Sequence, residues 1–178
     1  MILEPLGIPG ACLVKPDIKR DSRGTLSRIW CREDFAALGI ENEMANCCVV
    51  YNDRAGTIRG LHYQREPFAE AKLVRCLTGA IYDVIVDLRQ NSPTKGCWCS
   101  VELTAASNAS LFIPKGCAQG YQTLQDATEL LYHISAPYQP DYQAGIRWDD
   151  PKLAIEWPLP EPILSPRDRA LPNFKQAA

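Results

Sequence analysis

The feature that most constrains the fold is a series of short strand-like segments that begins at Cys47 and ends near residue 135. Each segment is rich in β-branched, aromatic or other apolar residues, and Gly, Pro, Asn, Asp and Ser separate the segments. Many short strands at near-regular spacing are typical of an antiparallel sandwich or barrel, with the jelly roll as the leading candidate. The expected strands are 47–51, 57–64, 71–78, 80–88, 97–103, 110–113, 120–124 and 128–135.

The flanking segments predict less regular structure. Residues 1–30 predict two short strands, at Leu13-Val14 and at Leu26 to Trp30, around a turn that Asp21 and Gly24 favour. Residues 32–40 predict a helix, because acids lie in its first turn and Gly39 can end it. The proline-rich tail, 136–178, is expected to be extended, apart from a short turn near Asp150. With 178 residues, the chain is expected to form a single domain, 1–178, with its jelly-roll core at about 45–135.

The composition excludes several classes of function. Hydrophobic residues make up 46%, charged residues 22%, and the net charge is -2, without the basic excess that recruits phosphate backbones. The N-terminus lacks a basic leader, and no window has eighteen consecutive apolar residues. We therefore expect a cytoplasmic protein that binds neither nucleic acid nor a membrane.

Eight cysteines raise the question of disulfides or zinc. Their spacings include an adjacent pair and a C-x-C, but no C-x-x-C, so neither pattern fits well. Cys76, Cys97, Cys99 and Cys117 lie in apolar, strand-like contexts, where a thiol behaves as a small hydrophobe. We expect reduced, structural cysteines.

The segment from Gly56 to Gln64 holds one of only two histidines, beside an arginine and two glycines. A histidine has an unperturbed pKa near 6.5 and is a natural general base at neutral pH. In a regular strand, Arg59 and His62 would point to opposite faces, but a bulge at Gly60 would let both face one cavity. This segment alone does not distinguish a general base from a structural histidine.

Strand alternation groups the other polar side chains. Tyr132 and His133 point to opposite faces and cannot share a cavity. Lys72 and Asp83 each share a face with apolar neighbours, which is costly unless the charge is paired or used. The alternative for both is an outward-facing charge on a wet sheet face.

The remaining motifs limit the chemistry. A metal-binding barrel of the cupin type needs several converging histidines, whereas His62 and His133 lie far apart and form no H-x-H pair. No nicotinamide-binding or ATP-binding loop appears. We therefore expect no metal and no cofactor, and acid–base chemistry by His, Tyr, Lys and Asp.

Several motifs follow one another in a fixed order: Asp21-x-Arg23-Gly24, Gly56 to Gln64, Lys72 to Arg75, Tyr82-Asp83-x3-Asp87-Leu-Arg89, Ser92 to Thr94, Ile113 to Gly116, Gly145 to Pro151 and Ile155-x-Trp157-Pro158. Together they resemble the dTDP-4-dehydrorhamnose 3,5-epimerase family over about residues 13 to 170. The resemblance implies a cupin-like jelly roll, a metal-free homodimer formed by strand exchange, and a nucleotide-linked 4-keto-6-deoxy sugar as substrate. A base would remove a hydrogen beside the ketone, and an acid would return a proton to the opposite face.

The resemblance also implies roles for individual residues. His62 matches the base, oriented by Asp168 in the tail, which would complete the site. Tyr132 matches the acid on the opposite face. Lys72 matches the residue that stabilises the enolate oxygen. Asp83 matches a residue that supports Lys72 from behind, without contacting the substrate itself.

Other matching positions concern the rest of the substrate. Arg59 matches a substrate contact, and Tyr138 lies near where an aromatic side chain approaches the nucleotide. Arg23 matches a diphosphate-binding arginine supplied by the neighbouring subunit, although its turn position alone predicts only a solvated side chain.

The chain departs from the family pattern in two places. Gln119 stands where a histidine usually lines the sugar site, and glutamine cannot titrate. Asn46, Cys48 and Val50 stand where relatives often carry a Gln and Asn pair and a Ser. The nucleotide base, the sugar and the number of inverted centres therefore stay open.

Three functions are compatible with the sequence. The first is an epimerase that inverts C3, C5 or both of a nucleotide-linked 4-keto sugar. The second is a ketoisomerase that moves the carbonyl between C4 and C3. The third is a sugar-nucleotide-binding protein without turnover, which Gln119 and the altered segment from Asn46 to Val50 would suit.

Overall fold

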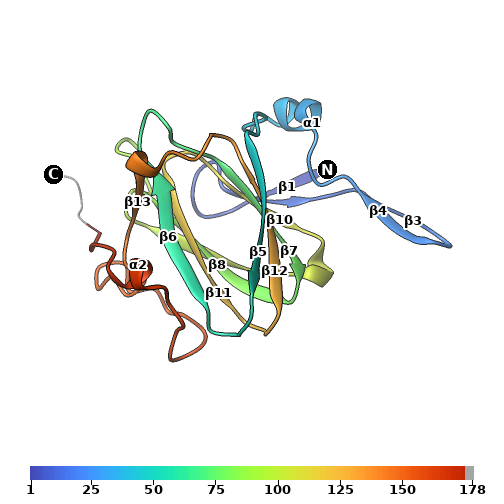
Figure 1. The fold of residues 1–178 in the computed structure, drawn as a ribbon. Coiled ribbons are helices and arrows are strands. Elements are labelled where there is room, and N and C mark those ends of the chain that lie inside the picture. Colours follow the sequence, from blue (N-terminus) through green and yellow to red (C-terminus); the bar gives the residue numbers. More distant parts are fainter. Residues whose placement is uncertain (175–178) are drawn as a thin grey trace.

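Two antiparallel β-sheets pack face to face in the computed structural model, which describes residues 1–174 (Figure 1). The six-stranded sheet has the order β1 (Ile2–Pro5), β2 (Cys12–Lys15), β10 (Ser110–Ile113), β7 (Lys72–Thr78), β12 (Thr128–Ile134) and β5 (Asn46–Asn52). The five-stranded sheet has the order β13 (Gln143–Gly145), β6 (Ile58–Gln64), β11 (Cys117–Thr123), β8 (Ala80–Asp87) and β9 (Trp98–Thr104). This is the jelly roll that the strand pattern favoured, in the cupin-like form that the resemblance implied.

The eight strands expected from residue 47 onward are all present, and most agree closely with their predicted bounds. The exception is β11, which begins at Cys117 rather than at residue 120 because its first residues continue the pairing with β8 as far as Asp87. The six-stranded sheet also extends beyond the expected core of 45–135, since β2 pairs with β10. β1, whose apolar residues are interrupted by Glu4 and Pro5, was not predicted.

The N-terminal region also forms a hairpin that projects away from the two sheets (Figure 1). β3 (Ile18–Asp21) and β4 (Gly24–Ser27) pair across the predicted turn, where Asp21 Oδ1 accepts a hydrogen bond from the Arg23 backbone N–H at 2.8 Å. The strand expected at Leu26 to Trp30 therefore starts and ends earlier than predicted.

The helix predicted at 32–40 is shorter, and α1 spans Arg32–Ala37. Gly39 adopts a φ of 70° just after the helix, which the glycine tolerates because it has no Cβ. Phe35 is fully buried and packs against Trp30 and Phe112. No helix within residues 1–174 is long and apolar enough to span a membrane.

The C-terminal tail packs on the outer face of the five-stranded sheet. Ile146, Leu153 and Ile155 bury against that sheet, and the turn predicted near Asp150 is present. Asp150 fixes this turn, because its carboxylate accepts hydrogen bonds from three backbone N–H groups, those of Lys152, Leu153 and Phe174. The tail also contains β13, a 3-10 turn at Pro140–Tyr142 and α2 (Pro166–Arg169), none of which was predicted.

All eight cysteines are free thiols in this structure. Cys76 and Cys117 are buried and Cys99 is partly buried, as expected for small hydrophobes, and burial raises the pKa of Cys117 to about 12. The expectation for Cys97 was wrong: it is exposed, because it belongs to the turn before β9 and donates its N–H to Thr94 O.

Candidate active site

A β-bulge at Gly60 opens the centre of β6. Arg59 pairs with Tyr121 and His62 pairs with Gln119, so Gly60 and Leu61 together oppose a single residue of β11. Gly60 has a φ of 130°, and a Cβ there would lie 2.5 Å from the Cα of Gly120. Only glycine fits this position. The predicted bulge is confirmed, and it lets Arg59 and His62 line the same cavity.

This cavity, the main cavity, has a volume of about 280 Å³ and lies between the two sheets, with the start of the tail at its rim. Its wall gathers side chains that are far apart in the sequence. The predicted site residues that line it are Asn46, Arg59, His62, Lys72, Gln119, Tyr132 and Tyr138.

His62 forms a hydrogen-bonded pair with a carboxylate of the tail. His62 Nε2 lies 2.7 Å from Asp168 Oδ1, which leaves Nδ1 for a ligand. Burial, the largest single effect, would raise the pKa of Asp168, but the hydrogen bond and charge of His62, together with hydrogen bonds from Gly60 and Ser165, outweigh burial and lower the pKa below its ordinary value. The His62 side chain is 27% exposed and therefore accessible from the cavity.

Local backbone and capping contacts of the tail position Asp168 beside His62. Ile163 exchanges backbone hydrogen bonds with Gly56 and Ile58 at the start of β6. Ser165 then caps α2, because its Oγ accepts a hydrogen bond from the Asp168 N–H at 3.0 Å. These contacts fix the tail beside the strand that carries His62.

Lys72 is buried in the cavity wall, where its ammonium group contacts two neighbouring groups. Its Nζ donates to the backbone oxygen of His62 at 3.1 Å and lies 3.3 Å from Glu70 Oε1. Asp83, expected to support Lys72 from behind, forms no ion pair with it, although the charge of Lys72 lowers the pKa of the Asp83 carboxyl group. Glu70, which the sequence pattern did not predict as a site residue, lies just before the strand that carries Lys72.

Asp83 lies behind the cavity wall and is completely buried. Its Oδ1 accepts a hydrogen bond from Gln119 Nε2 at 2.7 Å, whereas Oδ2 has no partner within residues 1–174. Burial raises the pKa of Asp83 to about 7, against the opposing effects of Gln119 and Lys72. The alternative of an outward-facing charge is wrong for both Asp83 and Lys72.

Replacing Asp83 with asparagine should remove a pH-dependent loss of stability. Because burial holds the folded-state pKa near 7, the unfolded chain releases this proton at lower pH than the folded one. Wild-type stability should therefore fall between about pH 4 and pH 7 through this group. In denaturant titrations, the free energy of unfolding of Asp83→Asn relative to wild type should rise by about 2.5 kcal/mol from pH 5 to pH 8. A difference that does not change with pH would contradict this expectation.

Tyr132 faces the main cavity, and its hydroxyl accepts a hydrogen bond from Gln119 Nε2 at 3.2 Å. Burial raises the pKa of Tyr132 well above its ordinary value, so the phenol is neutral and keeps its proton. As predicted, His133 points the other way, where it stacks on Trp30 with ring centroids 6.3 Å apart.

Two residues that the sequence reading missed hold Arg59 in place. Arg59 Nε donates to Asn52 Oδ1 at 3.0 Å, and Tyr121 donates to the same oxygen at 3.1 Å. Tyr121 lies two residues after Gln119 on β11, so the two side chains share a face of the strand. This spacing could have predicted that Tyr121 belongs to the site.

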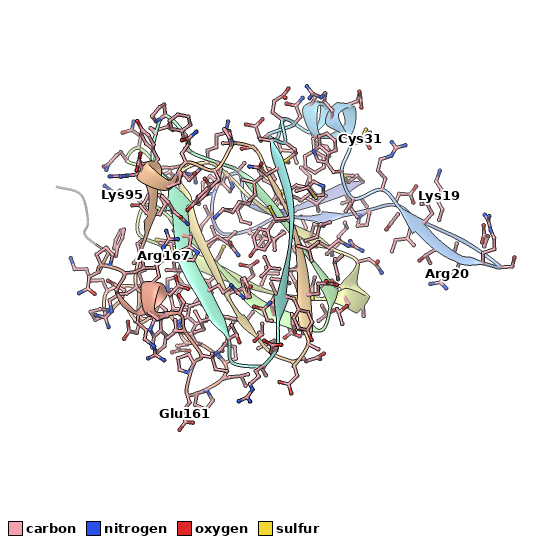
Figure 2. All side chains as sticks on the ribbon, viewed as in Figure 1. Lys19, Arg20, Cys31, Lys95, Glu161 and Arg167 are labelled. Atoms are coloured by element: carbon pink, nitrogen blue, oxygen red, sulfur yellow. The ribbon has the colours of Figure 1, made fainter. Side chains whose placement is uncertain are left out.

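Arg59 and His62 also border a second cavity of about 540 Å³. Arg54 and Arg167 line this second cavity, and Arg167 lies on the tail beside β6 (Figure 2). Three arginines therefore surround a space that adjoins the main cavity. Guanidinium groups bind phosphate oxygens through paired hydrogen bonds, so this space suits an anionic ligand.

Three residues of β5 that depart from the family pattern lie at the rim of the main cavity. Asn46, Cys48 and Val50 all line it from β5, and Asn46 donates to the backbone oxygen of Ala136 at 3.0 Å. Tyr138 is 57% exposed, and its hydroxyl donates to Gln143 Oε1 at 2.6 Å.

Arg23 lies outside both cavities. It occupies the tip of the projecting β3–β4 hairpin, with a side chain that is 88% exposed and paired with Asp21 at 2.6 Å. Lys19 and Arg20 lie on the same hairpin, well separated from Arg167 (Figure 2). The structure of one chain therefore does not bring Arg23 to its own site.

The part of the chain that the structure describes contains no cluster of three or more His, Cys, Asp or Glu residues placed to hold a metal ion.

Comparisons with known proteins identify the family. The model of the dTDP-4-dehydrorhamnose 3,5-epimerase family matches residues 5–176. A dTDP-4-dehydrorhamnose 3,5-epimerase of Sinorhizobium fredii is 39% identical over 98% of this chain and 90% of its own length. A dTDP-4-dehydrorhamnose 3-epimerase of Streptomyces niveus is 38% identical over 95% of this chain and 82% of its own length.

A solved structure agrees with these sequence matches. The crystal structure of dTDP-4-dehydrorhamnose 3,5-epimerase from Bacillus anthracis, with TDP and PPi bound, superposes with a TM-score of 0.94 and 39% identity over 97% of this chain and 99% of that chain. The fold, the order of the motifs and the match along nearly the whole length agree. The chain therefore belongs to the dTDP-4-dehydrorhamnose 3,5-epimerase family.

Proposed function

We propose that this protein is an epimerase that inverts C3, C5 or both of a nucleotide-linked 4-keto-6-deoxy sugar, of the type that converts dTDP-4-dehydro-6-deoxyglucose into dTDP-4-dehydrorhamnose. The observation that carries the proposal is the placement of an imidazole–carboxylate pair and a neutral phenol on one cavity. His62 belongs to the five-stranded sheet and Tyr132 to the six-stranded sheet, so the two groups approach the cavity from opposite sides. Inversion at carbon requires such a pair of proton-transfer groups.

The proposed reaction uses proton transfers alone. His62 removes a proton from a carbon beside the ketone, and the electrons of the broken C–H bond form an enolate with its negative charge on the ketone oxygen. Asp168 stabilises the imidazolium, and the Lys72 ammonium stabilises the enolate. Tyr132 then gives its proton to the opposite face of the carbon, and both groups exchange protons with water to return to their starting states.

We propose that the second cavity holds the diphosphate and that the nucleotide lies at the rim beside Tyr138. The positive charges of Arg54, Arg59 and Arg167 support this placement, as does the TDP and PPi content of the similar Bacillus anthracis structure. Arg23 would complete the phosphate site in a homodimer formed by strand exchange; its position at the tip of a hairpin that projects from its own two sheets supports this proposal (Figure 1).

Proton NMR of dTDP-4-keto-6-deoxyglucose incubated with the protein in deuterated water tests the proposal. Deuterium at both C3 and C5, with inverted products, is expected of a double epimerase, and deuterium at one carbon of a single-centre epimerase. A carbonyl that moves to C3 would instead identify a ketoisomerase. Tight binding without exchange, for this and other nucleotide-linked 4-keto sugars, would identify a binding protein and refute the proposal.

A further inference from the structure

A buried chain of hydrogen bonds links Asp83, Gln119 and Tyr132 across the space between the sheets. Gln119 Nε2 donates to Asp83 Oδ1 at 2.7 Å and to Tyr132 Oη at 3.2 Å. All three residues are buried, and Gln119 and Tyr132 line the main cavity while Asp83 lies behind it. A glutamine thus connects a buried carboxyl group with the phenol that faces the ligand.

The contacts of Gln119 define the direction of each hydrogen bond. An amide nitrogen carries two hydrogens, and these two contacts use both. Asp83 can accept in either protonation state, because its unpartnered Oδ2 is available to carry a proton while Oδ1 accepts. Gln119 therefore donates to Tyr132, and the phenol must direct its own hydrogen elsewhere.

The main cavity is the direction that remains for this hydrogen. The Tyr132 hydroxyl lies at the cavity wall and has no acceptor of its own within residues 1–174. Gln119 cannot supply a proton to the ligand, because an amide does not titrate near neutral pH and both of its hydrogens are engaged. The amide N–H is also in place to stabilise the phenolate that a proton transfer would leave.

We propose that Gln119 is a positioning residue that holds the Tyr132 hydroxyl with its proton directed at the substrate. The inference rests on the proposed epimerase function and deepens it. Gln119 occupies the place where the sequence departs from the family pattern, and it performs the orientation without a titratable group of its own. Both N–H groups of the Gln119 amide are engaged, so only its oxygen, Oε1, remains for the ligand. This oxygen is a hydrogen-bond acceptor and suits a sugar hydroxyl.

The fate of the enolate provides a measurement that separates positioning from general structural damage. Protonation by Tyr132 inverts the carbon, whereas return of a solvent deuteron by His62 to the original face gives exchange with retention. NMR in deuterated water measures both products. Gln119→Met should lower the ratio of inversion to total exchange about tenfold, as expected for loss of one orienting hydrogen bond. Total exchange, which depends on His62 and Lys72, should fall much less than inversion when it is measured at saturating substrate, where loss of the Oε1 acceptor has little effect.

Two further variants make the test specific. Gln122→Met changes a buried glutamine on the same strand that bonds instead to the backbone of Leu159, and it should keep the wild-type ratio. Tyr132→Phe should lower the ratio strongly, and adding Gln119→Met to it should have no further effect because the two residues act through one hydroxyl. Gln119→His, which offers an N–H donor at the same position, should retain much of the wild-type ratio.

Equal losses of inversion and exchange in Gln119→Met would overturn the inference, as would a further fall of the ratio when Gln119→Met is added to Tyr132→Phe. A wild-type ratio in Gln119→Met would overturn the inference alone, because wild-type turnover would still support the epimerase. Wild-type protein that exchanges no hydrogen of any nucleotide-linked 4-keto sugar would instead overturn the proposed function and this inference together.

Discussion

Replacing His62 with asparagine is expected to lower the rate of deuterium incorporation by roughly 10²–10⁴-fold, the usual range for loss of a general base. The amide of asparagine can keep a polar contact in the wall but cannot accept a proton from carbon near neutral pH. The loss should appear in kcat, whereas the dissociation constant of dTDP measured by calorimetry should change little. NMR in deuterated water and calorimetry on the same preparation provide both numbers.

The second histidine supplies a matched control for this experiment. His133 lies on the opposite face of β12 and stacks on Trp30 outside the main cavity. His133→Asn should therefore exchange and invert at close to the wild-type rate. A His62→Asn variant that retains wild-type exchange would show that another group removes the proton.

Much of the fold follows from local pattern, and so does part of the site. Turn residues between short apolar runs predicted the strands, and alternation with a period of two separated Tyr132 from His133. The glycine inside β6 predicted the bulge, because a residue without a side chain in a strand allows two neighbouring backbones to approach closely. These features depend on interactions between residues close in sequence or on a single paired strand.

The rest of the site depends on contacts that the local pattern does not contain. Asp168 meets His62 across 106 positions of the chain, and its approach requires the tail to pack on the sheet before α2 begins. Only the resemblance to a family suggested this pair. Glu70 was missed because it precedes the strand that carries Lys72, in a segment without a clear strand pattern. The direct partners of Lys72 and Asp83 were not predicted, because Glu70 and Gln119 reach them from segments that the local pattern does not connect with them.

Variants of the buried pair of Lys72 and Glu70 distinguish the effect of the Lys72 charge on the reaction rate from its effect on the stability of the protein. Lys72→Met keeps most of the apolar volume but leaves Glu70 buried without a counter-ion, so it should cost about 3–5 kcal/mol in the free energy of unfolding. It should also lower kcat for epimerisation by about 10²–10³-fold, because no fixed positive charge would face the enolate. Denaturant titration and initial rates by NMR measure the two effects.

The double variant Lys72→Met with Glu70→Gln tests why the rate of Lys72→Met is low. The cause is either the missing positive charge beside the enolate or the uncompensated charge of Glu70. Neutralising Glu70 removes the uncompensated charge, so the double variant should recover most of the lost stability. If the Lys72 ammonium stabilises the enolate, the rate should stay low although the protein is stable again. The single variant Glu70→Gln should keep a substantial rate, because Lys72 retains its hydrogen bond to the backbone oxygen of His62. A double variant that regains near-wild-type kcat would mean that Lys72 serves only to neutralise Glu70, and the enolate would then need another source of stabilisation.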